Sequence, residues 1–184
     1  MSPAPKLIVV AGPPGSGKTT LAHKIAAEVG CPAICRDEIK EGMARTTNGF
    51  VAGPGDALTV RTLPVFFGTI DLLIRAGVTT VAEAAFQDRT WRLGLEPLAD
   101  VAELRIVHCT VAADLAFRRS LRRRKDNPLR SAHPDPDPTD KAEWTRRHAE
   151  FERLALDAPW VEVDTTSGYR PTLLEIVTFA AGPS

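Results

Sequence analysis

The sequence is poor in cysteine, has no excess of either charge, and contains no long uninterrupted hydrophobic run. Its three cysteines, Cys31, Cys35 and Cys109, lack the paired C-x-x-C spacing of zinc sites, so we expect reduced thiols and no zinc site. The 23 basic and 23 acidic residues cancel, which gives no indication of a strongly basic nucleic-acid surface but leaves a local basic patch open. The apolar run at 7–11 is only as long as a strand, so we expect a cytoplasmic protein without a signal peptide or membrane span.

Short apolar runs rich in Val and Ile alternate with helical patterns along the 184 residues. Continuous runs of this kind are typical of parallel strands that are covered on both faces. The predicted strands are residues 6–11, 32–35, 78–83, 104–110 and 160–163. The predicted helices lie at about 18–29, within 58–76, and at 112–125, 140–156 and 172–180. The alternation predicts one α/β domain over 1–184, a three-layer sandwich around a five-stranded parallel sheet.

Two segments have the composition of irregular structure. Residues 46–56 contain three glycines and a proline, and residues 126–138 contain four prolines, which bar a regular helix. Each segment is either a cover over a substrate or a surface connection, and composition does not separate these two interpretations.

The turn between the first strand and the first helix matches the phosphate-binding pattern G-x-x-x-x-G-K-[ST] in full. Its residues are Gly12, Pro13, Pro14, Gly15, Ser16, Gly17, Lys18 and Thr19, followed by Thr20. Glycines let backbone N–H groups converge on phosphate oxygens, and the start of the helix adds the positive end of its dipole. Lys18 should reach the β- and γ-phosphates, and the Thr19 hydroxyl should ligate magnesium. The sequence therefore predicts a P-loop NTPase fold that binds ATP and Mg²⁺.

The P-loop alone does not identify how the nucleotide is used. The sequence lacks the Asn-Lys-x-Asp motif that recognises guanine, and its third strand does not end in the Asp-Glu pair of remodelling ATPases. Small kinases are the main group of P-loop proteins that remains.

After the second strand, residues 35–40 read C-R-D-E-I-K, and here the chain resembles a group of P-loop kinases. The group includes phage-type polynucleotide kinases and chloramphenicol phosphotransferase. The resemblance implies that Asp37 is the catalytic base, that Lys40, in place of an arginine, contacts the substrate, and that Glu83 lies beside the phosphates and the substrate. The residues alone also allow an N-cap aspartate, a solvated lysine and a strand-end acid that faces solvent.

A basic cluster follows the fourth strand, with seven Lys or Arg and one acid between residues 118 and 130. In the kinases that this chain resembles, a helical Arg-x-x-x-Arg closes over ATP as a lid. It matches Arg118 and Arg122, or Arg119 and Arg123 one position later. We predict Arg118 and Arg122 as catalytic residues of a lid at about 118–139, because arginines four apart share a helix face and can stabilise a transferring phosphate. The alternative is a solvated basic helix face.

The last strand leads into Asp-Thr-Thr, as in chloramphenicol phosphotransferase, and the resemblance places the following loop, with residues 168–170, near adenine. We interpret His133 as a turn residue rather than a catalytic group, because nothing in the sequence pairs with it.

These observations predict an ATP-dependent kinase that phosphorylates a hydroxyl of a small molecule such as a sugar, a metabolite or an antibiotic. A polynucleotide 5′-hydroxyl is the alternative acceptor, favoured by residues 36–40 and disfavoured by the zero net charge. A nucleotide-binding regulatory module that hydrolyses slowly or not at all is the second alternative, and Asp37 argues against it. The sequence identifies neither the acceptor nor the oligomeric state.

Overall fold

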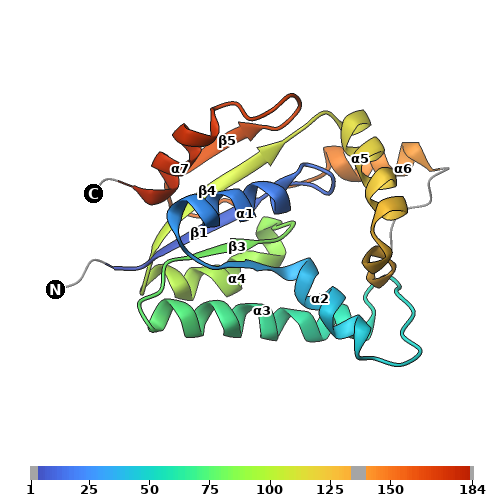
Figure 1. Ribbon diagram of the computed structural model, residues 1–184, viewed down its shortest axis with the longest axis horizontal. Helices are drawn as coiled ribbons and strands as arrows, with labels where there is room; N and C mark the ends of the chain where they lie inside the picture. The colour runs from blue at the N-terminus through green and yellow to red at the C-terminus, as the bar shows by residue number, and fades with distance from the viewer. Residues whose placement is uncertain (1–3, 134–139, 183–184) are drawn as a thin grey trace.

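A computed structural model describes residues 4–133 and 140–182, and it places a five-stranded parallel sheet between two layers of helices (Figure 1). The strands are β1 (Lys6–Ala11), β2 (Ala33–Cys35), β3 (Thr80–Glu83), β4 (Glu103–Thr110) and β5 (Trp160–Asp164). Their order in the sheet is β2-β3-β1-β4-β5, and every neighbouring pair is parallel. The predicted α/β three-layer sandwich with five parallel strands is confirmed.

The helices follow the alternation that the sequence predicts, with some additions and one shorter helix. They are α1 (Lys18–Val29), α2 (Arg36–Arg45), α3 (Ala57–Arg75), α4 (Asp88–Ala99), α5 (Ala113–Asp126), α6 (Lys141–Ala149), α7 (Leu173–Ala181) and a short 3₁₀ helix, η1 (Pro128–Ala132). The predicted helix ranges do not include α2, α4 or η1. The prediction also extended α6 to residue 156, but α6 ends at Ala149, because Leu154 enters the core and the Ala155 N–H donates to Asp88 on α4.

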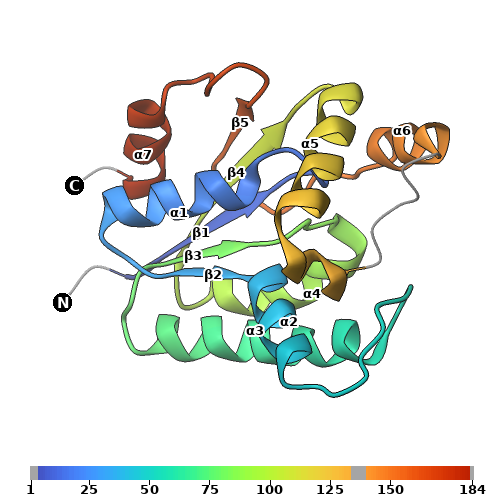
Figure 2. The same ribbon diagram turned by 45° about the vertical axis from the view of Figure 1, so that its right-hand side comes forward.

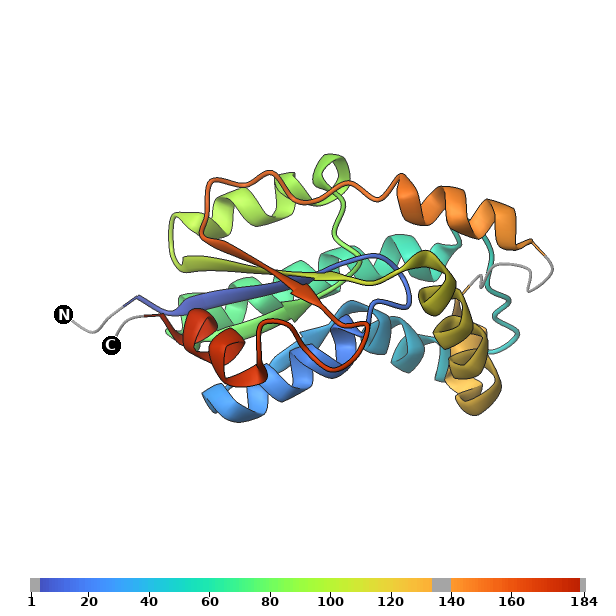
Figure 3. The same ribbon diagram turned by 90° about the horizontal axis from the view of Figure 1, so that it is seen from above.

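Both faces of the sheet are covered, which explains the continuous apolar runs (Figure 3). Leu7 and Val9 of β1 pack with α3 and α4 on one face, whereas Ile8 and Val10 pack with α1 and α7 on the other. Alternate side chains of a strand point to opposite faces, so both sets must be apolar.

Helix α3 is the longest helix of the described residues. It has 19 residues, and an 18-residue window of it has a mean hydropathy of 1.5, so by length and composition alone it is able to cross a membrane. Its buried side carries Phe66, Ile70 and Ile74, which pack against the sheet. This packing is that of a core helix in an α/β sandwich, and core helices pass the same test of length and composition.

The segments that sequence analysis singled out meet at the carboxyl edge of the sheet. Helices α5, α6 and η1 project beyond this edge, and η1 contacts α2 (Figure 2). Residues 46–56 are irregular, as predicted, and connect α2 to α3. The predicted lid at 118–139 corresponds to most of α5 and to η1, while its last part, 134–139, lies outside the described residues. Ligands of open parallel sheets bind at the carboxyl ends of the strands, so this is where we expect the functional site.

Candidate active site

The P-loop connects β1 to α1, and its glycines are required by both conformation and space. Gly12 and Gly15 have positive φ values of 148° and 79°. A Cβ at Gly12 would lie 2.6 Å from the Cys109 carbonyl oxygen, and a Cβ at Gly15 would overlap the backbone of Ala116. The nine residues predicted to bind phosphate, 12–20, lie together in this turn and in the first turn of α1. A side chain at either glycine would therefore collide with the backbone of β4 or α5 and displace the loop from this conformation.

Lys18, Thr19 and Glu83 come together beneath the P-loop. Lys18 Nζ is 3.8 Å from Glu83 Oε1, and both side chains are buried. Burial raises the pKa of the Glu83 carboxyl; the Lys18 charge and a hydrogen bond with Thr19 only partly oppose this, so the pKa stays above its usual value. The predicted position of Glu83 next to the phosphate end of the site agrees with this geometry.

Two buried polar atoms in and beside the P-loop lack a hydrogen-bond partner within the described part of the chain: Ser16 Oγ and Glu83 Oε2. Buried polar atoms are normally paired, so an unpaired hydroxyl in the P-loop and an unpaired carboxylate oxygen on the residue that contacts Lys18 indicate a polar ligand. Carboxylate and hydroxyl oxygens are also the ligands that magnesium prefers. The residues present therefore fit a magnesium–nucleotide phosphate group, with Thr19 and Glu83 as the oxygen ligands.

A cavity of about 370 Å³ opens on the other side of the P-loop. Its lining comes from the P-loop, α1, α5 and the loop after β5, and consists of Gly15, Gly17, Thr20, Lys24, Arg119, Arg123, Thr165, Gly168 and Tyr169. Thr165 Oγ1 donates to the Ser16 carbonyl at 2.7 Å, and Arg119 donates to the Thr165 carbonyl at 2.7 Å. Thr165 thus joins α5 to the P-loop, and the loop containing residues 168–170 borders the cavity.

The arginines that reach this cavity are Arg119 and Arg123, not the predicted Arg118 and Arg122. The Arg122 side chain is 85% exposed and its Nε lies 3.3 Å from Asp126, and Arg118 is exposed as well. Helix α5 buries Ala116 and Phe117 against Trp144 of α6, and this burial sets which helix face turns towards the P-loop. The second of the two pairs with Arg-x-x-x-Arg spacing therefore faces the site.

Asp37 lies in the first turn of α2 without capping it, since the N-cap residue is Cys35. Its side chain is 36% exposed, and its two oxygens contact different arginines. Oδ1 lies 3.1 Å from Arg36 Nη1, and Oδ2 lies 3.2 Å from Arg130 Nη1. The interpretation of Asp37 as a structural N-cap is therefore wrong.

The charge of Asp37 is fixed by its neighbours. Burial of part of the carboxyl raises its pKa, but the positive charges of His133, Lys18, Arg130 and Arg36 outweigh this effect and hold the pKa well below its usual value. Asp37 is therefore ionised at neutral pH. Its carboxylate interacts with the P-loop lysine and with residues of the lid.

Arg130 and His133 are the site residues whose positions the sequence did not predict. Besides Asp37, both contact Glu41 on the next turn of α2: His133 Nε2 is 3.2 Å and Arg130 Nη1 is 3.8 Å from Glu41 Oε1. His133 Nδ1 lies 3.9 Å from Asp37 Oδ1. These contacts join the end of the lid to α2, across more than 85 residues of sequence. His133 is thus part of the acidic–basic cluster around Asp37.

Lys40 has a different role from the predicted one. Its side chain is only 1% exposed, and Nζ lies 2.7 Å from Asp56 Oδ2 and 2.8 Å from Thr59 Oγ1. A buried lysine requires such a partner, because an unpaired charge is costly to remove from water. Burial raises the pKa of Asp56, but the bond from Lys40 outweighs it and the pKa falls to about 2. Lys40 therefore fastens α2 to the start of α3 and does not reach a substrate.

A second cavity, of about 630 Å³, lies between the irregular segment at 46–56 and the lid. Phe50, Val51 and Ala52 line one side, and residues of α5 and η1 line the other, namely Arg124, Asn127, Pro128, Arg130, Ser131 and His133. Arg130 and His133 connect this cavity to the Asp37 carboxylate. Residues 50–52 of the first irregular segment and residues 127–133 of the second thus face each other across an open space next to Asp37.

Solved structures with this fold include proteins described as kinases. A proposed kinase from Chloroflexus aurantiacus J-10-fl superposes with a TM-score of 0.84 at 22% identity, over 96% of both chains. Kti12 from Chaetomium thermophilum, solved with ADP-AlF3, gives 0.67 at 17% identity, over 96% of this chain and 100% of that chain. A sugar kinase from Janibacter sp. HTCC2649 gives 0.63 at 22% identity, over 96% and 94%. At these identities the likeness shows the fold.

No curated protein sequence matches the chain at a significant level. A family model, AAA_33, described as an AAA domain, matches residues 7–154, which include the P-loop, Asp37, Glu83 and the lid. The chain therefore belongs to this AAA domain family, and it shares its fold with solved structures that are described as kinases.

Proposed function

We propose that the protein is an ATP-dependent kinase that transfers the γ-phosphate of ATP to a hydroxyl group of a small molecule. One observation carries this proposal: the Asp37 carboxylate contacts Arg130 and His133, which line an open cavity, and the charge of the P-loop lysine, Lys18, helps to lower its pKa. An acceptor in the larger cavity would thus present its hydroxyl to Asp37, with the transferring phosphate held at Lys18.

Different groups of the chain bind different parts of the nucleotide. P-loop amides and Lys18 bind the β- and γ-phosphates, and Arg119 and Arg123 reach the nucleotide from α5. The loop with residues 168–170 borders the base. Magnesium, when held by Thr19 and Glu83 directly or through water, neutralises charge on the phosphates.

Asp37 positions the acceptor more than it activates it. A carboxylate with a lowered pKa is a weak base, but phosphoryl transfer depends chiefly on alignment and on charge stabilisation, with the proton leaving late. Arg36 and Arg130 fix the carboxylate plane through one contact on each oxygen. A carboxylate oxygen accepts more than one hydrogen bond, so an acceptor hydroxyl is able to join these contacts.

A polynucleotide 5′-hydroxyl is the second candidate acceptor. The exposed side of α5 carries Arg118, Arg122, Arg124 and Lys125, and Arg124 lies at the larger cavity. A row of exposed cations attracts a phosphate backbone. The balanced charge of the whole chain, with 23 basic and 23 acidic residues, favours the small molecule.

The test is a phosphotransfer screen with purified protein and magnesium ATP. One arm contains sugars, nucleosides and hydroxyl-bearing antibiotics, and a second arm contains 5′-hydroxyl oligonucleotides, with Lys18→Ala as the inactive control. A phosphorylated product in the first arm supports the proposal, and one in the second arm alone moves the assignment to a polynucleotide kinase. ATP binding without a phosphorylated product in either arm would make the protein a nucleotide-binding regulatory module.

A further inference from the structure

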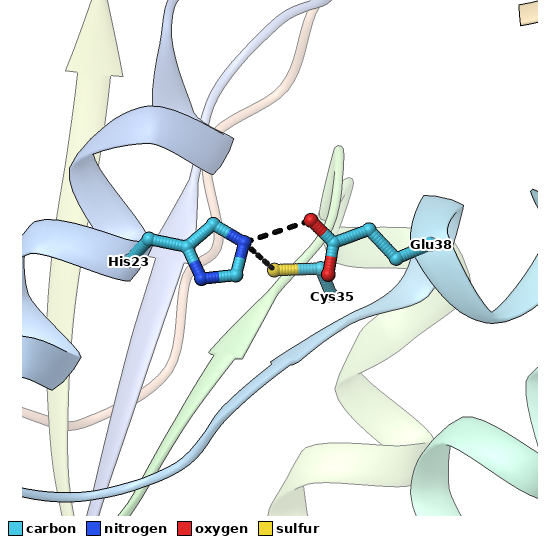
Figure 4. Close-up of side chains that lie close together, drawn as sticks. All are labelled: His23, Cys35 and Glu38. Carbon is cyan, nitrogen blue, oxygen red and sulfur yellow. Dashed lines mark hydrogen bonds and ion pairs between the residues drawn. The ribbon is translucent and has the colours of Figure 1, made fainter. Parts of the chain in front are cut away.

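A group of potential metal ligands lies beside the junction of β2 and α2. His23 of α1, Cys35 at the end of β2 and Glu38 in the first turn of α2 point towards one another (Figure 4). Their ligand atoms all lie within 4.8 Å of one another. His23 Nε2 is 2.7 Å from Glu38 Oε1 and 3.7 Å from Cys35 Sγ.

Both contacts converge on the same ring nitrogen, and this is the unusual feature of the cluster (Figure 4). A ring nitrogen carries at most one hydrogen, so it cannot donate a full hydrogen bond to the carboxylate and to the sulfur at once. An ion at the point where the three side chains meet would contact all three.

We propose that His23, Cys35 and Glu38 form a binding site for a divalent transition metal of the Zn²⁺ class. One imidazole nitrogen, one sulfur and one carboxylate oxygen are ligands that suit zinc, whereas magnesium prefers six oxygens. Coordination releases the Cys35 thiol proton to the buffer, and the thiolate and carboxylate together balance the charge of the ion.

The distances fit this ion after a small movement. Ordinary zinc bond lengths put a tetrahedral pair of nitrogen and sulfur ligands about 3.6 Å apart and a nitrogen and oxygen pair about 3.4 Å apart. The observed nitrogen–sulfur distance is 3.7 Å, and the nitrogen–oxygen distance of 2.7 Å must widen. The His23 and Glu38 side chains are 50% and 49% exposed, so they are able to move apart and leave a fourth position to water.

No motif in the sequence indicates this site, and the cysteine spacing predicted no zinc site. The ligands come from three elements, with His23 and Cys35 12 positions apart, and only the packing of α1 beside β2 brings them together.

The site is tested by calorimetric titration of the full chain with Zn²⁺, without nucleotide and in excess Mg²⁺. We expect one tight zinc ion per chain. Cys35→Ser and His23→Ala should each weaken binding at least roughly 10–100-fold, the loss that removing a second-shell partner already causes. Cys31→Ser, which changes a free cysteine outside the cluster, is the matched control and should bind as wild type does. Co²⁺ in place of zinc should give a thiolate-to-cobalt absorption band that Cys35→Ser abolishes.

Zinc affinity that is unchanged in all the cluster variants, or a cobalt complex without a thiolate band, would overturn the proposal. Cys35 is buried, so the serine variant is checked for folding by circular dichroism. If it does not fold, His23→Gln and Glu38→Gln decide the question, because both side chains are half exposed. Binding is measured without ATP, so its outcome does not depend on whether the protein is a kinase.

Discussion

Replacing Lys40 by methionine tests whether this residue is a structural tie or a substrate contact. Methionine keeps the length of the apolar stem but removes the charge that lies 2.7 Å from Asp56 Oδ2. Asp56 is 7% exposed, so the variant leaves a buried carboxylate without its counter-charge. Removing one partner of a buried ion pair costs about 3–5 kcal/mol. Backbone N–H groups of Gly53 and Thr59 still donate to Asp56, so we expect a value near the lower end.

The assay is urea unfolding of the wild type, Lys40→Met, Asp56→Asn and the double variant. A loss of about 3 kcal/mol lowers the melting temperature of a chain of this size by roughly 6–12 °C. The double variant should lose less than the sum of the two single variants, because it removes both charges. Lys125→Met, at an exposed position, should leave stability unchanged. If Lys40→Met unfolds like the wild type and raises KM for the acceptor, Lys40 is a substrate contact and the reasoning fails.

The ion pair between Lys40 and Asp56 should also appear in the pH dependence of the free energy of unfolding. The pKa of Asp56 falls from 3.8 to about 2 in the folded protein: burial raises it, but the bond from Lys40 and the backbone N–H groups lower it more. A folded-state pKa below the unfolded value adds stability that is complete above pH 4 and is lost as the pH falls towards 2. Lys40→Met should reduce this loss of stability between about pH 4 and 2, measured as ΔG of unfolding against pH.

Three further predictions concern the nucleotide site. The Cβ of Gly15→Ala would overlap the Ala116 backbone at a positive φ, so the P-loop would have to leave its conformation. We therefore expect this variant to abolish ATP binding in calorimetry without unfolding the chain. Arg119→Ala should lower kcat by about 10²–10³ if the guanidinium stabilises the transferring phosphate, whereas Arg122→Ala, its matched control on the exposed face, should stay near wild type. Equal losses in both would contradict the orientation of α5. Lys18→Ala should lose phosphotransfer while retaining the circular dichroism spectrum of the wild type.

The P-loop was predictable because its signal is local. Eight consecutive residues, Gly12 to Thr19, carry the glycines, the lysine and the hydroxyl, and each requirement is met within one turn of chain. Asp37 and Glu83 were predicted through the resemblance to P-loop kinases, and they lie just after and at the carboxyl end of a buried strand, where ligands of open parallel sheets bind.

The predictions of site residues failed where a contact with a residue distant in sequence determines the position of a side chain. Lys40 has the spacing of a substrate contact, but its ammonium group forms an ion pair with Asp56, which lies 16 positions later in an irregular segment. Arg118 and Arg119 begin pairs of identical spacing, and only the burial of Phe117 against α6 distinguishes them. Periodicity describes a helix face but not which neighbour will cover it.

Helix α4 was missed for a related reason. Gly94 and Pro97 lower the intrinsic helix propensity of its sequence. In the structure, Trp91 and Leu95 are buried in the core, and the ring of Phe67 from α3 lies where a side chain at position 94 would be. Tertiary packing therefore selects a glycine and stabilises a helix that local propensity disfavours.

The central claim is that Asp37 takes part in phosphate transfer from ATP to a hydroxyl, and one comparison tests it most directly. Single-turnover transfer of the labelled γ-phosphate is measured for wild type and for Asp37→Asn, with the acceptor that the screen identifies. The asparagine keeps the size of the side chain but loses the negative charge and one of the two acceptor oxygens that position the hydroxyl, and it cannot take the proton that leaves late. We therefore expect unchanged ATP affinity and a rate lower by about 10²–10⁴. A transfer rate in Asp37→Asn equal to that of the wild type would contradict the proposed mechanism.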